Sequence, residues 1–246
     1  MEIGIYDMNE ATKLGYKQRL DIYRETGFNA VSLYIDESYM SKGENYGDII
    51  DYARDIGLKV NQVHIDYKIS NDICNDPEKY YTYIIGRLSE CRNYGIENMV
   101  LHASYGEYPP AWGDEQLAMI EELADEFPEI NLAFENVRNN ENLIRVLELK
   151  KKNITMCYDM GHAHIYNATH MLDKYSTKIT CAHLHNNYGQ DDHNLLSDGD
   201  INFTPVLTRL EYLEVDCCLE VFPKRDKILS EKEFVEFVKQ AYEDCF

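Results

Sequence analysis

Short hydrophobic runs alternate along the chain with longer segments in which apolar residues recur every three or four positions. The short runs are rich in β-branched and aromatic residues and predict strands, whereas the longer amphipathic segments predict helices. The predicted strands cover residues 2–6, 30–35, 59–65, 98–103, 131–136, 154–159, 179–185 and 215–221. The predicted helices cover residues 11–26, 46–57, 77–94, 114–126, 140–152, 166–176, 204–211 and 230–243.

Local signals support several of the helix boundaries. Asp76 followed by Pro77 predicts a helix start, and so does Asp114. Ser230 with Glu233 three residues later forms a predicted capping box. Glycines that follow a helical segment predict helix C-caps. These glycines are Gly27, Gly57 and Gly95.

Eight strand–helix pairs favour a closed (β/α)8 TIM barrel, an α/β fold, as a single domain over residues 1–246. An open doubly wound sheet is the main alternative. Such a sheet would carry a Gly-rich phosphate loop early in the chain, and the sequence has none there. The pattern therefore predicts the barrel.

Metal-type side chains stand near the ends of six predicted strands. They are His64, His102, Glu135, Asp159, His185 and Glu220. We expect them to meet, because the C-terminal ends of all barrel strands open on one mouth. A glutamate ending an apolar strand needs a buried Arg or Lys partner or a metal, and the neighbouring strand ends offer imidazole and carboxylate instead. We therefore predict a site for one divalent cation, with a donor set that suits Mn²⁺, Mg²⁺, Co²⁺ or Zn²⁺. Its predicted ligands are Glu135, Asp159, His185 and Glu220.

The roles of the other histidines are less directly indicated by the sequence. His162 follows Asp159 by three residues and is either a solvated loop residue or a contact to substrate or a second metal. His183 shares a strand face with His185, and we expect it to be packed or hydrogen-bonded one layer below. His164 and His170 are predicted to be surface residues, and the long polar loop from Asn186 to Thr204 is predicted to be functional.

The chain carries 44 acidic and 24 basic residues, a formal net charge of −20. Acidic residues also outnumber basic ones in the predicted mouth loops. The basic residues there are Lys13, Lys42, Lys68, Arg138, Lys224, Arg225 and Lys227. The acids are more numerous and include Asp7, Glu37, Glu107, Asp191, Asp192, Asp198 and Asp200. Such a surface repels nucleic acid and anionic membranes, and it suits small neutral or weakly charged ligands.

Seven cysteines without CxxC spacing predict reduced thiols, mostly in the core, and a cytoplasmic protein. The start of the chain lacks the pattern of a signal peptide, and no apolar run reaches the length of a membrane span. The sequence leaves a homo-oligomer open.

Several further side chains could contact a substrate. Tyr6, Tyr34 and Trp112 could line the apolar face of a substrate, or could pack in the core or a lid. Lys224 and Arg225 follow the last strand, where barrels often bind phosphate, but a solvated charge pair is an equal alternative.

Five motifs together resemble the xylose isomerase-like TIM barrels, a superfamily of sugar and sugar phosphate isomerases and epimerases that also contains endonuclease IV. They are ENV at 135–137, DMGH at 159–162, HLHNN at 183–187, DDHNLLSDGD at 191–200 and LEVF at 219–222. The resemblance implies that Glu135, Asp159, His185 and Glu220 bind one metal. It also implies that Glu135 and Glu220 are catalytic and move a proton through a metal-stabilised enediolate of a ketose in carbohydrate metabolism.

Endonuclease IV binds three zinc ions, and the resemblance supplies a counterpart for each additional ligand. These counterparts are His64, His102, His162, Asp191 and His193. A multi-zinc phosphodiesterase is therefore the alternative function, with up to three metals, although the acidic mouth favours the isomerase. Ketose 3-epimerases commonly have an Arg six residues after the metal-binding His, where this chain has Asp191. A sugar-binding protein without catalysis is the least favoured function, because none of the predicted ligands is missing.

Overall fold

Eight strands form the centre of the fold. The computed structural model describes residues 1–35, 39, 42–224 and 227–245, so Glu37 and Arg225 lie outside the described residues. The strands are β1 (Ile3–Tyr6), β2 (Ala30–Ile35), β3 (Lys59–Ile65), β4 (Asn98–His102), β5 (Asn131–Glu135), β6 (Ile154–Asp159), β7 (Ile179–Leu184) and β8 (Asp216–Leu219). They follow one another in chain order around a closed barrel, which confirms the predicted (β/α)8 fold.

Helices connect the strands. The α-helices are α1 (Tyr16–Thr26), α3 (Tyr46–Asp55), α4 (Asp72–Asn75), α5 (Pro77–Tyr94), α6 (Asp114–Glu126), α7 (Glu141–Leu147), α8 (Met160–Ile165), α9 (Met171–Lys174), α10 (Thr204–Tyr212) and α11 (Glu231–Glu243). Two 3-10 helices, η1 (Asn9–Ala11) and η2 (Tyr67–Asn71), follow β1 and β3.

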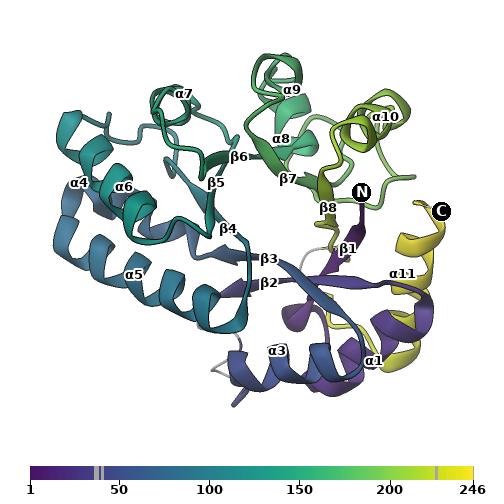
Figure 1. Ribbon diagram of the computed structural model, residues 1–246. Helices are drawn as coiled ribbons and strands as arrows, with labels where there is room; N and C mark the ends of the chain where they lie inside the picture. Colours follow the sequence, from purple (N-terminus) through teal and green to yellow (C-terminus); the bar gives the residue numbers. More distant parts are fainter. Residues whose placement is uncertain (36–38, 40–41, 225–226, 246) are drawn as a thin grey trace. The chain divides into compact units, whose positions relative to one another are not determined.

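The chain divides into two compact units. The terminal unit comprises Met1–Asn61 and Ala182–Phe246, and the central unit comprises Gln62–Cys181. In the terminal unit, β1 pairs in parallel with both β2 and β8. Helices α1, α3 and α11 gather beside these strands (Figure 1). The ring of Tyr23 on α1 packs against Phe234 on α11 with a centroid distance of 5.8 Å, which joins the two helices.

The central unit is built on β3, β4, β5 and β6, which pair in parallel in that order. Its core includes a buried layer of small side chains, with one residue from each of β4, β5, β6 and β7. The layer consists of Val100, Ala133, Cys157 and Cys181. Helices α5 and α6 run side by side (Figure 1), and the Tyr81 hydroxyl donates a hydrogen bond to Glu122 between them at 2.9 Å.

Several of the predicted boundaries are confirmed, although α1 begins at Tyr16 and α7 ends at Leu147, each five residues inside its predicted range. Asp76 accepts a hydrogen bond from the amide of Lys79 at the start of α5, and Gly27, Gly57 and Gly95 all have positive φ where helices end. Helix α6 differs slightly, because Gly113 is its N-cap and Asp114 its first residue. The predicted helix 166–176 is wrong: α8 begins directly after β6, and Asn167, with φ of 54°, separates it from the short α9.

Asp7 corrects one sequence-based expectation. We placed it among the acids of the mouth, but its side chain is fully buried. It accepts hydrogen bonds from Nε of Arg19 at 2.9 Å and from the hydroxyls of Tyr23 and Tyr39 at 3.1 and 2.9 Å. Arg19 also pairs with Glu44 at 2.8 Å. Asp7 therefore neutralises a buried cation and adds no free charge to the surface.

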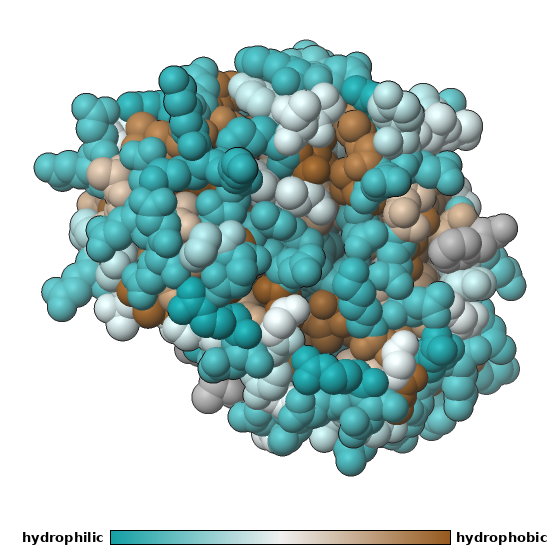
Figure 2. Space-filling model, viewed as in Figure 1, coloured by the Kyte–Doolittle hydropathy of each residue, from teal (hydrophilic) through white to brown (hydrophobic). Residues whose placement is uncertain are grey.

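The outer surface matches the composition. On the face drawn in Figure 2, hydrophilic residues cover most of the surface. All seven cysteines are free thiols, and five of them are buried, as expected for reduced core residues. Among the described residues, no helix combines the length and the apolar character needed to cross a membrane.

Candidate metal centre

Glu135 is the centre of a histidine cluster in the central unit. It ends β5, and 1% of its side chain is exposed. Its Oε2 lies 3.0 Å from Nε2 of both His64 and His102, and its Oε1 lies 3.0 Å from Nδ1 of His162. Ligand atoms of His64, His102 and Glu135 all lie within 4.8 Å of one another. The structure therefore brings together four of the side chains predicted from the sequence.

The orientation of His64 presents a nitrogen lone pair to this carboxylate. Its Nδ1 lies 2.7 Å from the carbonyl oxygen of Ile65, which can only accept, so Nδ1 carries the proton of the neutral ring. Its Nε2 is then an acceptor and faces a second acceptor, Oε2 of Glu135, at 3.0 Å. Two acceptors at this distance need a proton or a cation between them. The donor set therefore fits a divalent metal.

His102 is suited to the same role. Burial lowers its pKa below the ordinary value of 6.5, although the nearby carboxylate of Glu135 acts in the opposite direction. Burial therefore favours the neutral imidazole, which is the form that binds a metal.

Asp159 is held in place by the side chain of Asn136. This fully buried amide donates from Nδ2 to the carbonyl of Asp159 and accepts from its N–H, both at 2.8 Å. Oδ1 of Asp159 accepts the amide hydrogen of His162 at 2.6 Å and thereby caps α8. The cap places Nδ1 of the His162 ring 3.8 Å from the same carboxylate. Two predicted site residues thus lie side by side because a helix starts where the strand ends.

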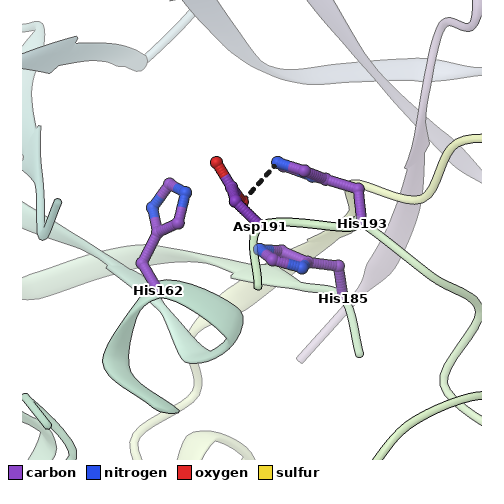
Figure 3. A group of neighbouring side chains, drawn as sticks. All are labelled: His162, His185, Asp191 and His193. Atoms are coloured by element: carbon purple, nitrogen blue, oxygen red, sulfur yellow. Dashed lines mark ion pairs between the residues drawn. The ribbon is translucent and has the colours of Figure 1, made fainter. Parts of the chain in front are cut away.

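In the terminal unit, Glu220 follows β8 and has two histidines beside its carboxylate. Its Oε2 lies 3.1 Å from Nδ1 of His183 and 4.0 Å from Nδ1 of His193. His193 also places Nε2 3.1 Å from Oδ1 of Asp191, the ion pair dashed in Figure 3. The rings of His185 and His193 stack with a centroid distance of 3.9 Å (Figure 3). His183, expected to be packed or hydrogen-bonded, contacts Glu220 directly.

His193 repeats the arrangement of His64. Its Nδ1 lies 2.9 Å from the carbonyl oxygen of Glu220 and must donate to it, so Nε2 of the neutral ring is an acceptor facing the carboxylate of Asp191. A backbone carbonyl that fixes the imidazole tautomer is the usual support of a metal-binding histidine. The terminal unit thus presents its own set of metal-type donors.

The loop that carries Asp191 and His193 is organised around Asn186. This side chain is 1% exposed; it donates to the carbonyl of Leu196 at 2.7 Å and accepts from the amide of Ile201 at 3.0 Å. The backbone of Asn186 pairs with Asn194 through two hydrogen bonds of 2.9 Å. A fixed loop therefore supports the two candidate ligands.

Sequence reasoning did not assign roles to Asn136 and Asn186. A signal was present, since each directly follows a predicted ligand, Glu135 in ENV and His185 in HLHNN. An asparagine next to a strand-end ligand could have been recognised as a residue that bonds to neighbouring backbone.

The aromatic side chains considered for substrate contact lie in different environments. Tyr6 and Tyr34 are half-buried, and Tyr6 meets Phe222 edge to face at 5.1 Å. Trp112 is 1% exposed and packs on Phe134 at 6.0 Å, in agreement with the core-packing interpretation. Among the basic residues, Lys224 is exposed.

Residues 20–238 match the family described as xylose isomerase-like TIM barrel. The chain belongs to this family. The resemblance inferred from the five motifs is thereby confirmed.

Several solved structures resemble nearly the whole chain in fold. The structure of L-ribulose 3-epimerase has a TM-score of 0.77 and 17% identity, over 98% of this chain and 92% of that one. The structure of the IolI protein with a zinc atom has a TM-score of 0.78 and 15% identity, over 99% and 97%. These likenesses establish the fold.

The chain is also similar in sequence to a curated protein. The uncharacterized protein MJ1311 of Methanocaldococcus jannaschii is 28% identical over 173 residues. The match spans 58% of this chain and 58% of that relative, so the chain covers little more than half of its length.

Proposed function

We propose that the protein is a divalent-metal-dependent isomerase or epimerase of a sugar, a sugar phosphate or a related ketose. One observation carries the proposal: the two strand-end glutamates, Glu135 and Glu220, each lie against imidazole nitrogens, at 3.0 and 3.1 Å. Membership of the xylose isomerase-like family supports it, and so does the similarity to an L-ribulose 3-epimerase and to a zinc-containing IolI protein.

The proposed metal ligands stand at or directly after the ends of β5, β6, β7 and β8, which are consecutive in the barrel order. Parallel barrels gather such strand ends at one mouth. The ligands are Glu135, Asp159, His185 and Glu220. Mn²⁺, Zn²⁺, Co²⁺ and Mg²⁺ all suit this mixture of carboxylate and imidazole donors.

The reaction would be a proton transfer next to a carbonyl group. A bound cation would polarise that carbonyl and stabilise the negative charge that develops on its oxygen. Glu135 and Glu220 would remove the proton from carbon and return it, and His162 would orient a substrate oxygen. The bonds from Asn136 would keep the Asp159 backbone fixed throughout.

Two measurements test the proposal. Elemental analysis of protein purified without chelator or metal-affinity resin should find about one divalent ion per chain. Incubation with L-ribulose and other ketoses in D₂O should place deuterium on the carbon beside the carbonyl, as detected by NMR. Glu220→Gln should slow this exchange by about 10²–10⁴-fold, because a general acid–base group typically contributes that factor.

Glu115→Gln is the matched control, since Glu115 is exposed on α6. Its exchange rate should equal that of the unaltered protein. Undiminished exchange in Glu220→Gln would remove Glu220 from the mechanism, and the absence of exchange with every ketose would contradict the isomerase assignment.

A multi-zinc phosphodiesterase is the second candidate. The pairing of His193 with Asp191, in which two acceptors face each other at 3.1 Å, favours a further cation in the terminal unit. Two or three zinc ions per chain, together with hydrolysis of bis(p-nitrophenyl) phosphate, would establish this function in place of the first.

A further inference from the structure

Three rings form a ladder in the central unit that leads from solvent to Glu135. Tyr105, 45% exposed, lies at its outer end, with its ring centroid 5.1 Å from that of Tyr67. Tyr67 stacks on His102 at 5.7 Å with an angle of 20° between the rings. Nε2 of His102 then reaches Oε2 of Glu135 at 3.0 Å. The ladder thus joins an exposed aromatic surface to a proposed catalytic carboxylate.

The two tyrosines are fixed relative to each other through their backbones. Asn71, at the end of η2, donates from Nδ2 to the carbonyl of Tyr105 at 2.8 Å and accepts the amide hydrogen of Tyr105 at 3.1 Å. Tyr67 begins the same 3-10 helix. Both bonds therefore hold the loop after β4 against the segment after β3.

The base of the loop after β4 is fixed as well. The buried amide of Asn142 donates to the carbonyls of Ala103 and Pro110 at 3.2 and 3.0 Å. It also accepts from the backbone of Trp112 at 2.9 Å. One side chain therefore ties the two ends of the loop together, and Tyr105 projects from an ordered support.

We infer that Tyr67 and Tyr105 form a stacking subsite for the C–H face of a bound sugar. Sugar-binding walls need a flat apolar surface with polar groups at its edge, and tyrosine supplies both. Nζ of Lys68 lies 6.0 Å from the centroid of the Tyr67 ring and adds one polar group beside it. Since the ring surface is already ordered, little entropy is lost when a ligand binds to it.

The inference rests on the proposed function, and it adds a place for the part of the sugar that does not react. With the reacting carbons at Glu135, the remaining carbons would lie along Tyr67 and Tyr105. The subsite would then contribute to ground-state binding and transition-state binding alike, so it would lower KM without changing kcat.

Saturation-transfer NMR with L-ribulose as the probe tests the subsite without any need for turnover. Irradiation of the tyrosine ring protons should transfer saturation to carbon-bound protons of the sugar. Tyr105→Ala should weaken this transfer and raise the Kd about three- to tenfold, the factor expected for an aromatic contact of ordinary strength. Tyr105→Phe should restore binding, whereas Tyr105→Leu, which lacks a planar ring, should not.

Tyr108→Ala is the matched control. Tyr108 lies in the same loop and is 89% exposed, so its replacement should leave the Kd unchanged. Equal Kd values for the unaltered protein, Tyr105→Ala and Tyr108→Ala would overturn the inference, and so would the absence of saturation transfer to L-ribulose. Tyr105-dependent binding without metal-dependent exchange would leave the subsite standing and refute only the isomerase.

Discussion

Buried asparagines fix the backbone next to the site residues. Asn136 bonds twice to Asp159, Asn142 closes the loop of Tyr105, and Asn186 organises the loop of His193. A primary amide provides two donors and one acceptor oxygen on a short, uncharged stem. It can therefore satisfy several backbone groups in the interior without the desolvation cost of an ionised side chain.

Asn136→Ala tests this role at the end of β6. The variant loses both bonds to Asp159, and we expect metal affinity to fall about 10–100-fold, as is usual when support for a ligand is removed. Calorimetric titration with Mn²⁺ or Zn²⁺ measures the change. Asn131→Ala, at the opposite end of β5, removes a side-chain bond to Asn98 and should bind metal normally. Equal affinities in the two variants would contradict the prediction.

The sequence revealed candidate ligands at single positions but not the partners of buried charges. Glu135 was recognised because it ends an apolar strand, and His162 because it follows the strand-end residue Asp159 by three positions. Asp7 was misjudged because its cation, Arg19, is 12 residues away on a helix, and Glu44 follows 25 residues later. Pairing over such separations depends on helix rotation and loop path, which a local pattern does not encode.

At the level of elements, boundaries were predictable where capping residues mark them. Helix α5 covers residues 77–94 as predicted, because Asp76, Pro77 and Gly95 give clear start and stop signals. The region after β6 lacks such signals, and the left-handed conformation of Asn167 divides it into two short helices. That break is set by the tertiary context of the loop and not by hydrophobic periodicity.

Helix α11 offers a test of capping. Ser230 and Glu233 bond reciprocally at its N-terminus. The hydrogen bond from the Ser230 backbone, with further help from its hydroxyl and from Lys227, lowers the pKa of Glu233 to about 2. The folded-state pKa lies below the ordinary value of 4.5, so the stabilisation is present above pH 4.5 and is lost as pH falls toward 2.

We expect Glu233→Ala to reduce the free energy of unfolding at pH 7 and to have a smaller effect at pH 3. Urea titrations of both proteins at each pH measure the difference. Glu236→Ala removes an exposed carboxylate of the same helix and should show little pH dependence. A Glu233→Ala effect that is the same at both pH values would contradict the assignment.

Gly199 tests the packing of the loop between β7 and α10. A Cβ atom there would lie 2.2 Å from Oδ1 of Asn186 and 2.6 Å from the backbone nitrogen of Asn187. Gly199→Ala should therefore destabilise the protein by about 1–3 kcal/mol, as overpacking does, and increase hydrogen exchange in the loop of His193. Gly86→Ala, on α5 with open space around it, should instead stabilise by about 0.5–1 kcal/mol. Thermal unfolding distinguishes these opposite signs.

At the scale of the whole molecule, the alternation of strands and helices predicted the strand order. Neighbouring parallel strands need a crossover helix between them, and such crossovers are right-handed. Eight consecutive βα units can therefore close into a barrel with the strands in chain order. The organisation as a single domain over residues 1–246 stays a prediction. The identity of the metal ligands and the number of metal ions stay predictions as well. A sequence motif shows which side chains are present, but it does not fix their rotamers.

Charge is also a property of the whole molecule. With a formal net charge of −20, the protein should not bind duplex DNA, because phosphate contacts supply most of the affinity of such complexes. A gel-shift titration with duplex DNA that carries an abasic site tests this. It should be run at low ionic strength, where phosphate contacts are strongest. A retarded band that disappears with added salt would favour the phosphodiesterase.

The anchoring of the His193 loop makes that loop sensitive to a change outside it. The amide and hydroxyl of Ser197 both donate to Oδ2 of Asp244, at 2.9 and 2.7 Å, so the loop is tied to residues directly after α11. A substitution that removes the carboxylate of Asp244 would release this tie and loosen the support of Asp191 and His193.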